Sequence, residues 1–410
     1  MEQEERTHTK DTGVFWRYWA ASTVTRLGDQ VTAVALPLVA VVTLHASAIE
    51  VGLITAAAYV AWLVLGLPAG VLVQRLPLRA TQVAMDLLRA AAIASVPLAS
   101  AFGVLSLPQL VVVALVVGFA SVLFDVGNMS FLPSIVPKEQ LTARNSLMSG
   151  SVAATETAGP SLGGVLVQLV GGAGAMLLDA VSYLASAALL NSLPRGRREE
   201  PSADRPRMRE QVREGWRFVV EHPVIRPCVA DATAINFVCG GLMTLTPVFL
   251  VRTLDAPAVA VGALMATGGL GSVIGAALTP RVVARYGSAR ALLGATVVAT
   301  AFLLVLPLAG SGWATLLFAL GNAGFSGGVV VTAIITRTHR MTHTPPELLS
   351  RVVATVRFVS WGAIPVGAVA AGAAAEALGT RTALLVVALV GIASPAVLFT
   401  SSIRRLRDLA

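Results

Sequence analysis

The stretch TETAGPSLGGVLVQ, residues 155–168, combines features that an ordinary soluble helix does not keep together. It lies in a long apolar block, yet it contains Glu156, Pro160 and three glycines. Proline and glycine are the residues that weaken a helix most. In a membrane they are tolerated, because neighbouring helices can satisfy the freed backbone groups. The stretch therefore raises the question of whether the whole chain consists of membrane helices.

Composition favours a membrane protein. Of the 410 residues, 55% are hydrophobic and only 13% are charged, against roughly 25% charged residues in a soluble domain. The apolar residues form blocks of about 20, the length that crosses a ~30 Å hydrocarbon core as a helix. These blocks lack the alternation that marks strands of a membrane barrel. We predict an all-α membrane protein with twelve transmembrane helices, at 18–43, 50–72, 80–101, 107–131, 144–169, 173–193, 227–250, 259–283, 289–309, 313–335, 352–374 and 380–402.

Positive charge is distributed unevenly among the loops. Of the 30 Lys and Arg residues, 25 lie in the termini and the even-numbered loops, whereas the odd-numbered loops hold only Arg252 and Arg381. Loops rich in Lys and Arg stay in the cytoplasm. We therefore expect a multi-pass protein of the cell inner (cytoplasmic) membrane with both termini cytoplasmic. The net charge of +8 then reports topology and predicts no nucleic-acid partner.

One long polar segment, 194–226, divides the spans into six and six. We expect an N-terminal six-helix bundle at 1–193, a cytoplasmic linker at 194–226 and a C-terminal six-helix bundle at 227–410. A helix in the second part of the linker would be amphipathic, which suits either a helix lying on the inner leaflet or a solvated linker helix. Its apolar face would carry Met208, Val212, Trp216 and Val219.

The two halves share spaced residues, which indicates an internal repeat. Pro160 recurs as Pro365, an offset of 205. The same offset relates Gly66 and Gly70 to Gly271 and Gly275, and an offset of 206 relates Arg75 and Arg79 to Arg281 and Arg285. Two six-helix units repeated in parallel and joined by a cytoplasmic linker resemble the major facilitator transporters, whose substrates bind near the midplane between the halves.

The opening stretch carries a glycine-proline motif in the fifth predicted span: Gly159, Pro160, Gly163 and Gly164. Proline frees a carbonyl and kinks a helix, while glycines let a neighbouring helix approach closely. The motif resembles the antiporter motif of major facilitator exporters, which implies a hinge on which two halves rock. The alternative is that these residues are simply common in membrane helices.

Longer stretches resemble the macrolide efflux and enterobactin exporter group of drug:proton antiporters. They are RLGDQVTAVALPLV (26–39), FLPSIVPKEQLTARNSL (131–147), GPSLGGVLVQLVGGAGAMLLDAVSYLASA (159–187) and REGWRFVVEHPVIR (213–226). The resemblance covers most of the chain. It implies export of a small amphiphilic molecule (a drug, a macrolide or a siderophore-like compound) in exchange for protons.

The loop after the second span departs from the superfamily pattern Gly-x-Leu-Ala-Asp-Arg-x-Gly-Arg-Lys. Here Gly70, Arg75 and Arg79 are present, but Gln74 stands where the motif has aspartate. In the family that aspartate belongs to a charged latch on the cytoplasmic side. The latch should therefore be weaker in this chain, unless Asp86 and Arg89 in the third span supply part of it. These two lie one turn apart and could instead pair with each other.

Proton coupling requires a titratable group that water can reach. A charge at the centre of a bilayer costs about 2.5–3.5 kcal/mol, so an acid kept there is a functional candidate. Counting at 1.5 Å per residue places Asp29 and Glu156 near mid-membrane, and Asp125, Asp179 and Asp231 nearer the ends. Arg26, one turn before Asp29, could form a structural pair with it. Arg357 could reach Glu156 from another helix.

Four further residues are candidates to line a substrate cavity, although ordinary helix packing is the favoured interpretation of each: Tyr59, Trp62, Asn236 and Trp361. The five histidines all lie outside the predicted spans, which argues against a histidine relay. Cys228 and Cys239 are too far apart on one helix for a disulfide.

Other classes of protein have little support. The chain lacks the phosphate-binding loop of an ATP-driven pump, any His or Cys pair with metal-ligand spacing, and a nucleophile elbow. We therefore expect that the protein is not an enzyme and binds no metal and no cofactor. No feature of the sequence requires more than a monomer. Three hypotheses remain: a proton-coupled exporter, a facilitator or importer of the same fold, and a non-transporting receptor on a transporter scaffold.

Overall fold

The computed structural model describes residues 2–66, 76–137, 140–194 and 208–409. Inside these ranges the side chains of residues 2–12, 129, 130, 133, 134, 142, 153, 156–158, 160, 161, 208, 209, 211, 258, 346, 347 and 350 are not described. The first half of the chain forms α1 (Glu2–Leu38), continued by a π-helical turn (Val39–Thr43), then α2 (Ala48–Leu65), α4 (Leu78–Ala101), α5 (Leu107–Ile135) and α6 (Leu141–Asn191).

The helix α6 contains two spans in one continuous assignment. Its 51 residues would extend about 77 Å at 1.5 Å per residue, far more than a bilayer needs. Within it, Gly171 has φ of 74° and ψ of 167°, a conformation that glycine adopts easily and other residues rarely do. The chain therefore turns at Gly171, and the two limbs match the fifth and sixth predicted spans.

The second half begins with α7 (Met208–Glu221) in the predicted linker. It continues with α8 (Ile225–Val248), a π-helical turn (Phe249–Thr253), α9 (Ala258–Tyr286), α10 (Ser288–Leu303), α11 (Thr315–His343), α12 (Pro346–Trp361), α13 (Ala363–Leu378), α14 (Thr380–Val390) and α15 (Ala393–Thr400). Short 3-10 turns connect several of these helices and precede the C-terminus. The described residues contain helices and no strand.

Eleven helical segments among the described residues are long and apolar enough to cross a membrane. They match the predicted spans one for one, except that the first limb of α6 is not among them as a separate segment. The all-α membrane fold predicted from composition is therefore confirmed. Cys228 and Cys239 are free, as their spacing predicted.

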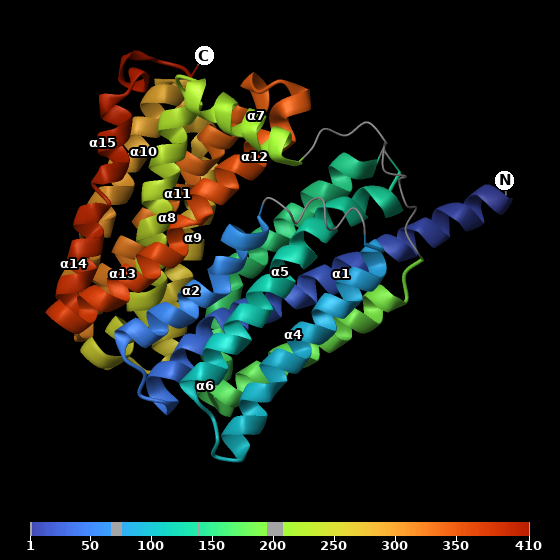
Figure 1. The fold of residues 1–410 in the computed structure, drawn as a ribbon, viewed down its shortest axis with the longest axis horizontal. Coiled ribbons are helices and arrows are strands. Elements are labelled where there is room, and N and C mark those ends of the chain that lie inside the picture. The colour runs from blue at the N-terminus through green and yellow to red at the C-terminus, as the bar shows by residue number, and fades with distance from the viewer. Residues whose placement is uncertain (1, 67–75, 138–139, 195–207, 410) are drawn as a thin grey trace.

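Two groups of helices lie side by side (Figure 1). One comprises α1 to α6 and the other α8 to α15, with α6 packed on α9 and α2 packed on α13 between them. We call the end that carries α7 and the C-terminus the linker end, and the end with loops 44–47 and 254–257 the far end. The groups lie together toward the far end and diverge toward the linker end (Figure 1).

Contacts at the far end are close because small residues lie on both sides. A Cβ added to Gly52 on α2 would lie 2.7 Å from the carbonyl oxygen of Ala368 on α13. One added to Gly372 would lie 2.7 Å from Cα of Ile49. The side chain of Arg252 also donates a hydrogen bond to the carbonyl of Ala46. Close backbone approach of this kind is how membrane helices associate tightly.

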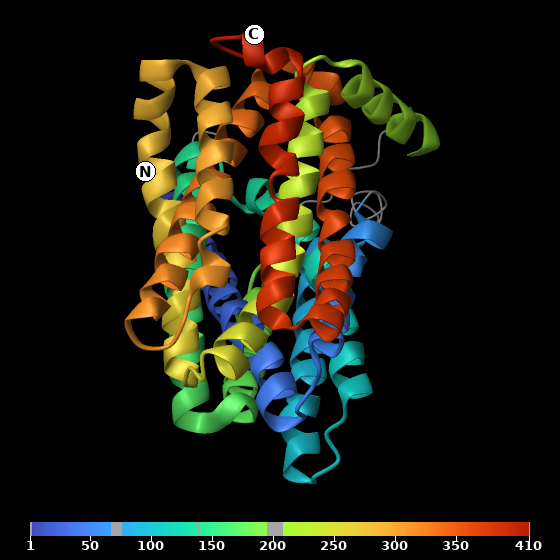
Figure 2. The same cartoon turned by 90° about the vertical axis from the view of Figure 1, so that its left-hand side faces the viewer.

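The linker helix α7 packs on α12 with a face that differs from the predicted one. Val219 is buried with Val352 and Val356, and a Cβ on Gly215 would lie 2.9 Å from the carbonyl oxygen of Arg351. Trp216, predicted on the same apolar face as Val219, is instead 51% exposed. The reason is that α7 packs on α12 with the face that carries Gly215 and Val219, and Trp216 lies outside this face. Figure 2 shows α7 leaving sideways from the top of the C-terminal group.

The helix α11 runs further than predicted, through His343 rather than to residue 335. As a result His339 is helical and buried, and its ring stacks on that of His343 with 4.2 Å between centroids. The ring of His222, in the turn between α7 and α8, lies 5.8 Å from that of His339. The helix α11 therefore extends past the end of the predicted span and includes His339 and His343.

Candidate functional site

Two aspartates and an arginine from different helices meet inside the N-terminal group. Asp29 lies on α1, and Asp86 and Arg89 lie one turn apart on α4. The Nη1 atom of Arg89 is 3.7 Å from Oδ1 of Asp29, and its Nη2 atom donates a hydrogen bond to Oδ1 of Asp86. Arg89 and Asp86 are fully buried, whereas the side chain of Asp29 is 37% exposed. One buried guanidinium therefore holds one buried and one accessible carboxylate.

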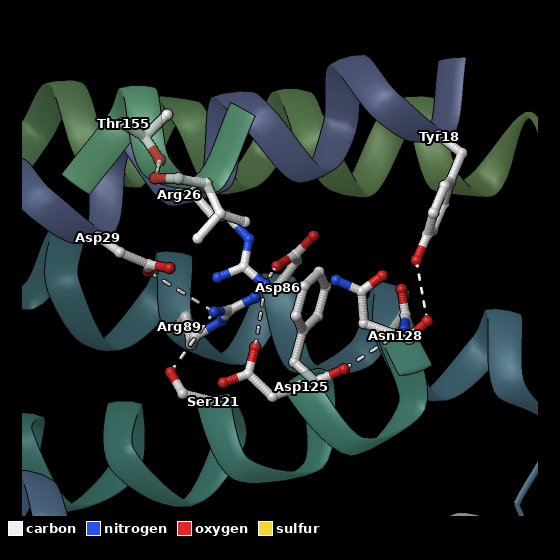
Figure 3. Close-up of polar contacts among 12 residues, drawn as sticks. Tyr18, Arg26, Asp29, Asp86, Arg89, Ser121, Asp125, Asn128 and Thr155 are labelled. Carbon is white, nitrogen blue, oxygen red and sulfur yellow. Dashed lines mark hydrogen bonds and ion pairs between the residues drawn. The ribbon is translucent and has the colours of Figure 1, made fainter. Parts of the chain in front are cut away.

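A second ion pair lies beside the first. The Nη2 atom of Arg26, on α1, is 3.6 Å from Oδ1 of Asp125 on α5. The described ion pairs thus join Arg26 to Asp125 and Asp29 to Arg89, and they do not include the local Arg26–Asp29 pair that sequence spacing allowed. Figure 3 shows the five side chains pointing toward one another between α1, α4 and α5. We call Arg26, Asp29, Asp86, Arg89 and Asp125 the charged cluster.

Aromatic rings enclose the guanidinium of Arg89. Its Cζ atom lies 4.3 Å from the ring centre of Phe124 and 4.5 Å from that of Tyr183, so the cation rests against two π faces. The hydroxyl of Tyr183, on α6, also donates a hydrogen bond of 2.5 Å to Oδ1 of Asp29. Tyr183 therefore contacts both members of the pair, and it orients the accessible carboxylate.

Asp179 lies one turn before Tyr183 on α6 and is fully buried. Its carboxylate accepts hydrogen bonds from the hydroxyls of Thr32 on α1 and Ser182 on its own helix. The backbone of α1 packs closely against this carboxylate, because a Cβ added to Gly28 would lie 2.0 Å from Oδ1 of Asp179. This carboxylate therefore fixes the contact between α1 and α6.

Sequence reasoning did not select Asp125, Asp179 and Tyr183. Depth was counted from predicted span ends, but the helices extend beyond the bilayer thickness: α5 has 29 residues. Asp125 and Asp179 both contact the helix that carries Asp29. A signal was present in the spacing of Asp179 and Tyr183, which are four residues apart and share one helix face.

Of the residues predicted to form a gate at the loop after the second span, Gly70, Gln74 and Arg75 lie outside the described ranges. Arg79, at the start of α4, donates hydrogen bonds to the carbonyl of Leu193 and to Oδ1 of Asn191, at 2.6 and 2.9 Å. It therefore ties α4 to the end of α6 within one group of helices. Asp86 and Arg89 do pair with each other, and they belong to the charged cluster.

The glycines of the opening stretch face α1. A Cβ on Gly159 would lie 2.4 Å from Cβ of Gln30, and one on Gly163 would lie 3.2 Å from Cα of Val31. Gly164 is buried as well. Glu156 and Pro160 lie on α6 at positions whose side chains are not described. The glycines thus allow close packing of α1 on α6, the helix pair that also carries Asp29 and Tyr183.

Trp62 and Trp361 meet between the two groups of helices. Their ring centres are 4.7 Å apart with planes at 69°, and Trp62 comes from α2 whereas Trp361 ends α12. The guanidinium of Arg357 lies 5.6 Å from the ring centre of Trp62 and 5.3 Å from that of Trp361. One cation and two indoles therefore meet where the two groups of helices are in contact.

The other two predicted cavity residues behave differently. Asn236 donates its amide hydrogen bond to the carbonyl of Ala232 in its own helix, at 2.8 Å. Tyr59 is half-buried on α2, three residues before Trp62. Among the described residues no group of three or more His, Cys, Asp or Glu side chains could hold a metal ion.

Comparisons with known proteins give the family. Residues 10–410 match the model of the transmembrane secretion effectors, a family of major facilitator superfamily transporters. An uncharacterised transporter of this superfamily, y4rN of Sinorhizobium fredii (strain NBRC 101917 / NGR234), is 29% identical over 355 residues, 86% of each chain. The multidrug efflux pump Tap of Mycolicibacterium fortuitum is 29% identical over 382 residues, covering 88% of this chain and 89% of that one.

Solved structures share the fold at low sequence identity. The nucleoside transporter NupG aligns with a TM-score of 0.73 at 12% identity, over 94% of this chain and 98% of its own. A bacterial homologue of the iron transporter ferroportin, in an inward-facing state, aligns with a TM-score of 0.70 at 17% identity, over 94% and 99%. With the family model covering nearly all residues, the chain belongs to the transmembrane secretion effector family of major facilitator superfamily transporters.

Proposed function

We propose that this transporter is a secondary active exporter that moves small amphiphilic organic molecules out of the cell in exchange for protons. The observation that carries the proposal is the contact between buried Arg89 and partly exposed Asp29. The relative named a multidrug efflux pump supports the substrate class and the direction. Family and fold point to a transporter rather than an enzyme.

The charge balance of the cluster suits proton binding. It contains three carboxyl groups and two guanidiniums, so the fully ionised cluster has one negative charge in excess. One bound proton removes that excess, which matters because net charge inside a membrane protein is costly. Asp29 and Asp125 are the two accessible carboxylates, 37% and 36% exposed, and we place the proton on Asp29 because its partner Arg89 keeps a second carboxylate, Asp86.

Protonation of Asp29 would release α1 from α4. The neutral carboxyl no longer attracts Arg89, and Arg89 keeps its partner Asp86 on its own helix. The hydrogen bond from Tyr183 weakens at the same time, because its acceptor loses its charge. A single proton thus changes contacts among α1, α4 and α6, the helices that would carry the change to the glycine contacts of Gly159 and Gly163.

Alternating access follows from the arrangement of the two groups of helices. We propose that residues 1–193 and 227–410 rock as two bundles joined by the linker 194–226, as a monomer in the lipid bilayer. The excess of positive residues in the termini and even-numbered loops supports a cytoplasmic location for the linker end and both termini. The divergence toward that end then corresponds to a state that accepts substrate and releases protons inside the cell (Figure 1). Trp62, Trp361 and Arg357 lie where the bundles meet and would contact the substrate.

Proton flux in reconstituted vesicles tests the coupling. With ethidium as the amphiphilic probe, we expect wild type to show probe-dependent proton movement, and Asp29→Asn to abolish it while the protein stays folded. Asp255→Asn is the matched control, because Asp255 is exposed at the far end and its φ of 50° suits asparagine equally well. Glu156→Gln tests the second acid proposed from sequence.

Each of the remaining functions gives a different result. Probe transport that persists in Asp29→Asn and Glu156→Gln without proton movement in wild type would indicate a facilitator or importer. Probe binding without transport would indicate a receptor. A reversible thiol crosslink between Ile49→Cys and Glu376→Cys, whose parent residues are in contact across the far end at 3.5 Å, tests the rocking motion. Transport should stop when the link forms and return on reduction, and unchanged transport in the linked protein would exclude alternating access.

A further inference from the structure

A cavity of about 380 Å³ opens at the linker end, away from the charged cluster. Three segments line it: the end of α7 with the following turn, the first turns of α8, and the end of α15 with the residues after it. These helices are neighbours, and Figure 2 shows α7 leaving from the top of α8 beside α15. The cavity therefore lies where the helices end, the level at which lipid headgroups would lie if α8 and α15 cross the membrane.

The lining is polar at one level and apolar at the next. Arg226 lies in the first turn of α8, and Ala230 lies one turn deeper, toward the membrane interior. On α15 the same order holds, with Thr400 at the end and Val397 about one turn deeper. Both Arg226 and Ala230 are exposed. A ligand that fills this cavity would meet a cation and hydroxyls at its head and apolar surface at its tail.

The polar level carries an excess of positive charge. Within the described ranges no carboxylate pairs with Arg226, and the one acid in the lining, Glu221, already pairs with Arg217 at 2.9 Å. Arg404 and Arg405 lie two and three residues after the lining residue Ser402, and both are exposed. The hydroxyl of Ser402 donates a hydrogen bond of 3.3 Å to the carbonyl of Pro223, a long bond that an anionic oxygen could replace.

The turn that carries this cavity is fixed in place. The Nδ1 atom of His222 accepts hydrogen bonds from the backbone N–H groups of Val224 and Ile225, at 3.2 and 3.1 Å. The start of α8, and with it Arg226, is therefore held in position before any ligand binds. A preformed site loses less entropy when a ligand binds.

An exposed apolar stripe leads from α7 to the cavity. Val220, which lines it, is 41% exposed, and Trp216, one turn earlier on the same face, is 51% exposed. Tryptophan is enriched where proteins meet the membrane interface, because one part of its ring system is apolar and its N–H is polar. Arg213 and Arg217 are also exposed on α7. The surroundings of the cavity thus suit the headgroup region of a bilayer.

We propose that this cavity binds an anionic phospholipid, with its phosphate on Arg226 and the hydroxyl of Ser402 and an acyl chain against Ala230 and Val397. Charge-assisted hydrogen bonds from arginine to phosphate are among the strong ones, and basic pockets between membrane helices recognise lipid headgroups. Inorganic phosphate shares the chemistry of the headgroup but has no apolar part that could contact Ala230 and Val397. The site lies at the joint between linker and C-terminal helices, so an occupied site would also fix α7 on the bundle.

Lipid binding to the purified full-length protein in detergent tests the proposal, measured as the apparent Kd of the first bound phosphatidylglycerol by native mass spectrometry. We expect Arg226→Gln to weaken binding about fivefold, the effect of one cation near the headgroups. Arg226→Lys should retain most of the affinity. Arg290→Gln, which removes an exposed arginine at the start of α10 outside the cavity, is the matched control and should leave the Kd unchanged.

Ala230→Phe tests the apolar level, because a larger side chain would occupy the acyl-chain position while the charge stays. It should weaken phosphatidylglycerol binding without changing the melting temperature of the lipid-free protein. Phosphatidylcholine should bind more weakly than phosphatidylglycerol, and inorganic phosphate at the same concentration should not displace the lipid. Equal losses in Arg226→Gln and Arg290→Gln, or displacement by inorganic phosphate, would overturn the assignment to a lipid.

Discussion

Arg89 on α4 and Asp29 on α1 face each other with 3.7 Å between Nη1 and Oδ1, and their side chains are 1% and 37% exposed. Asp86 completes the arrangement with a fully buried carboxylate on the other side of the guanidinium. Burial divides the roles of the two acids. Asp86 neutralises a cation that has no access to water, whereas the carboxylate of Asp29 is exposed, as the proposed proton exchange requires.

The two acids should therefore differ in their effect on stability. Asp86→Asn leaves the charge of Arg89 buried, with the carboxylate of Asp29 at 3.7 Å as its other ion-pair partner. We expect a loss of about 3 kcal/mol in the free energy of unfolding. Asp29→Asn removes a longer and partly exposed pair, and we expect a loss below about 1 kcal/mol. Denaturant unfolding of the purified protein measures both. Similar losses for the two variants would contradict the division of roles.

Close packing at Gly28 gives a second prediction. A Cβ at this position would meet the carboxylate of Asp179 and lie 2.2 Å from Oγ of Ser182, so Gly28→Ala must push α1 away from α6. We expect a loss of about 1–3 kcal/mol, the usual cost of overpacking. Gly13→Ala is the control on the same helix, because nothing lies within 4 Å of its added Cβ. A Gly28→Ala protein as stable as Gly13→Ala would show that α1 and α6 are packed less closely than described.

The turn before α8 should make stability depend on pH. Burial lowers the pKa of His222 below its ordinary value of 6.5, with a smaller contribution from the nearby His343. Below pH 6.5 the unfolded chain binds a proton that the folded protein resists, so folding stability falls as the pH drops through 6.5. The loss is complete below the folded pKa. Protonation at Nδ1 would also break the hydrogen bonds from Val224 and Ile225.

When the pH is lowered from about 7.5 to about 5, we expect the melting temperature of His222→Asn to fall less than that of wild type. Asparagine can accept the same backbone hydrogen bonds but does not titrate in this range. His339 and His343 are present in both proteins. Parallel pH curves for wild type and His222→Asn would argue against a role for this residue.

Composition and span length were sufficient to predict the all-α membrane fold, because a bilayer fixes both the length and the polarity of a helix that crosses it. The turn at Gly171 was also visible, as the gap between the spans predicted at 144–169 and 173–193. The amphipathic face of α7 was only partly predictable. Val219 and Trp216 are both apolar, and which of them packs on α12 depends on a contact between segments far apart in the chain.

The charged cluster was predictable only in part. Asp29 was selected because an acid inside a span is costly, Arg26 because it lies one turn before Asp29, and Asp86 and Arg89 as part of the cytoplasmic latch. Asp86 and Arg89 pair within α4, as their spacing allowed, but the partners of Asp29 and Arg26 come from other helices. Spacing along one helix suggested Arg26 as the partner of Asp29, whereas the structure pairs Arg26 with Asp125 on α5. Likewise, Trp62 and Trp361 were candidates separately, and only the packing of α2 on α12 brings the two rings together with Arg357.

The eleventh span breaks near Pro365. Its counterpart in the internal repeat is Pro160, at which the fifth span was predicted to bend. The helix α12 ends at Trp361 and α13 begins at Ala363, four and two residues before Pro365. Proline lacks the N–H that would bond the carbonyl of residue 361, and its ring crowds that carbonyl. The break thus lies directly behind Trp361, the ring that meets Trp62 from the other group of helices. Motion at the break would move this contact without disturbing the close packing at Gly372.

Replacing this proline should stabilise the protein and slow transport. Pro365→Ala restores the missing hydrogen bond, and a preference of about 1 kcal/mol for the straight helix would reduce turnover about fivefold. Binding of the transported probe should change little. Pro97→Ala is the control for restoring a helical hydrogen bond, because Pro97 also lies inside a helix, α4, which packs on α5 and α6 of its own group. A higher melting temperature with unchanged turnover in Pro365→Ala would show that the break is a packing feature and takes no part in the transport cycle.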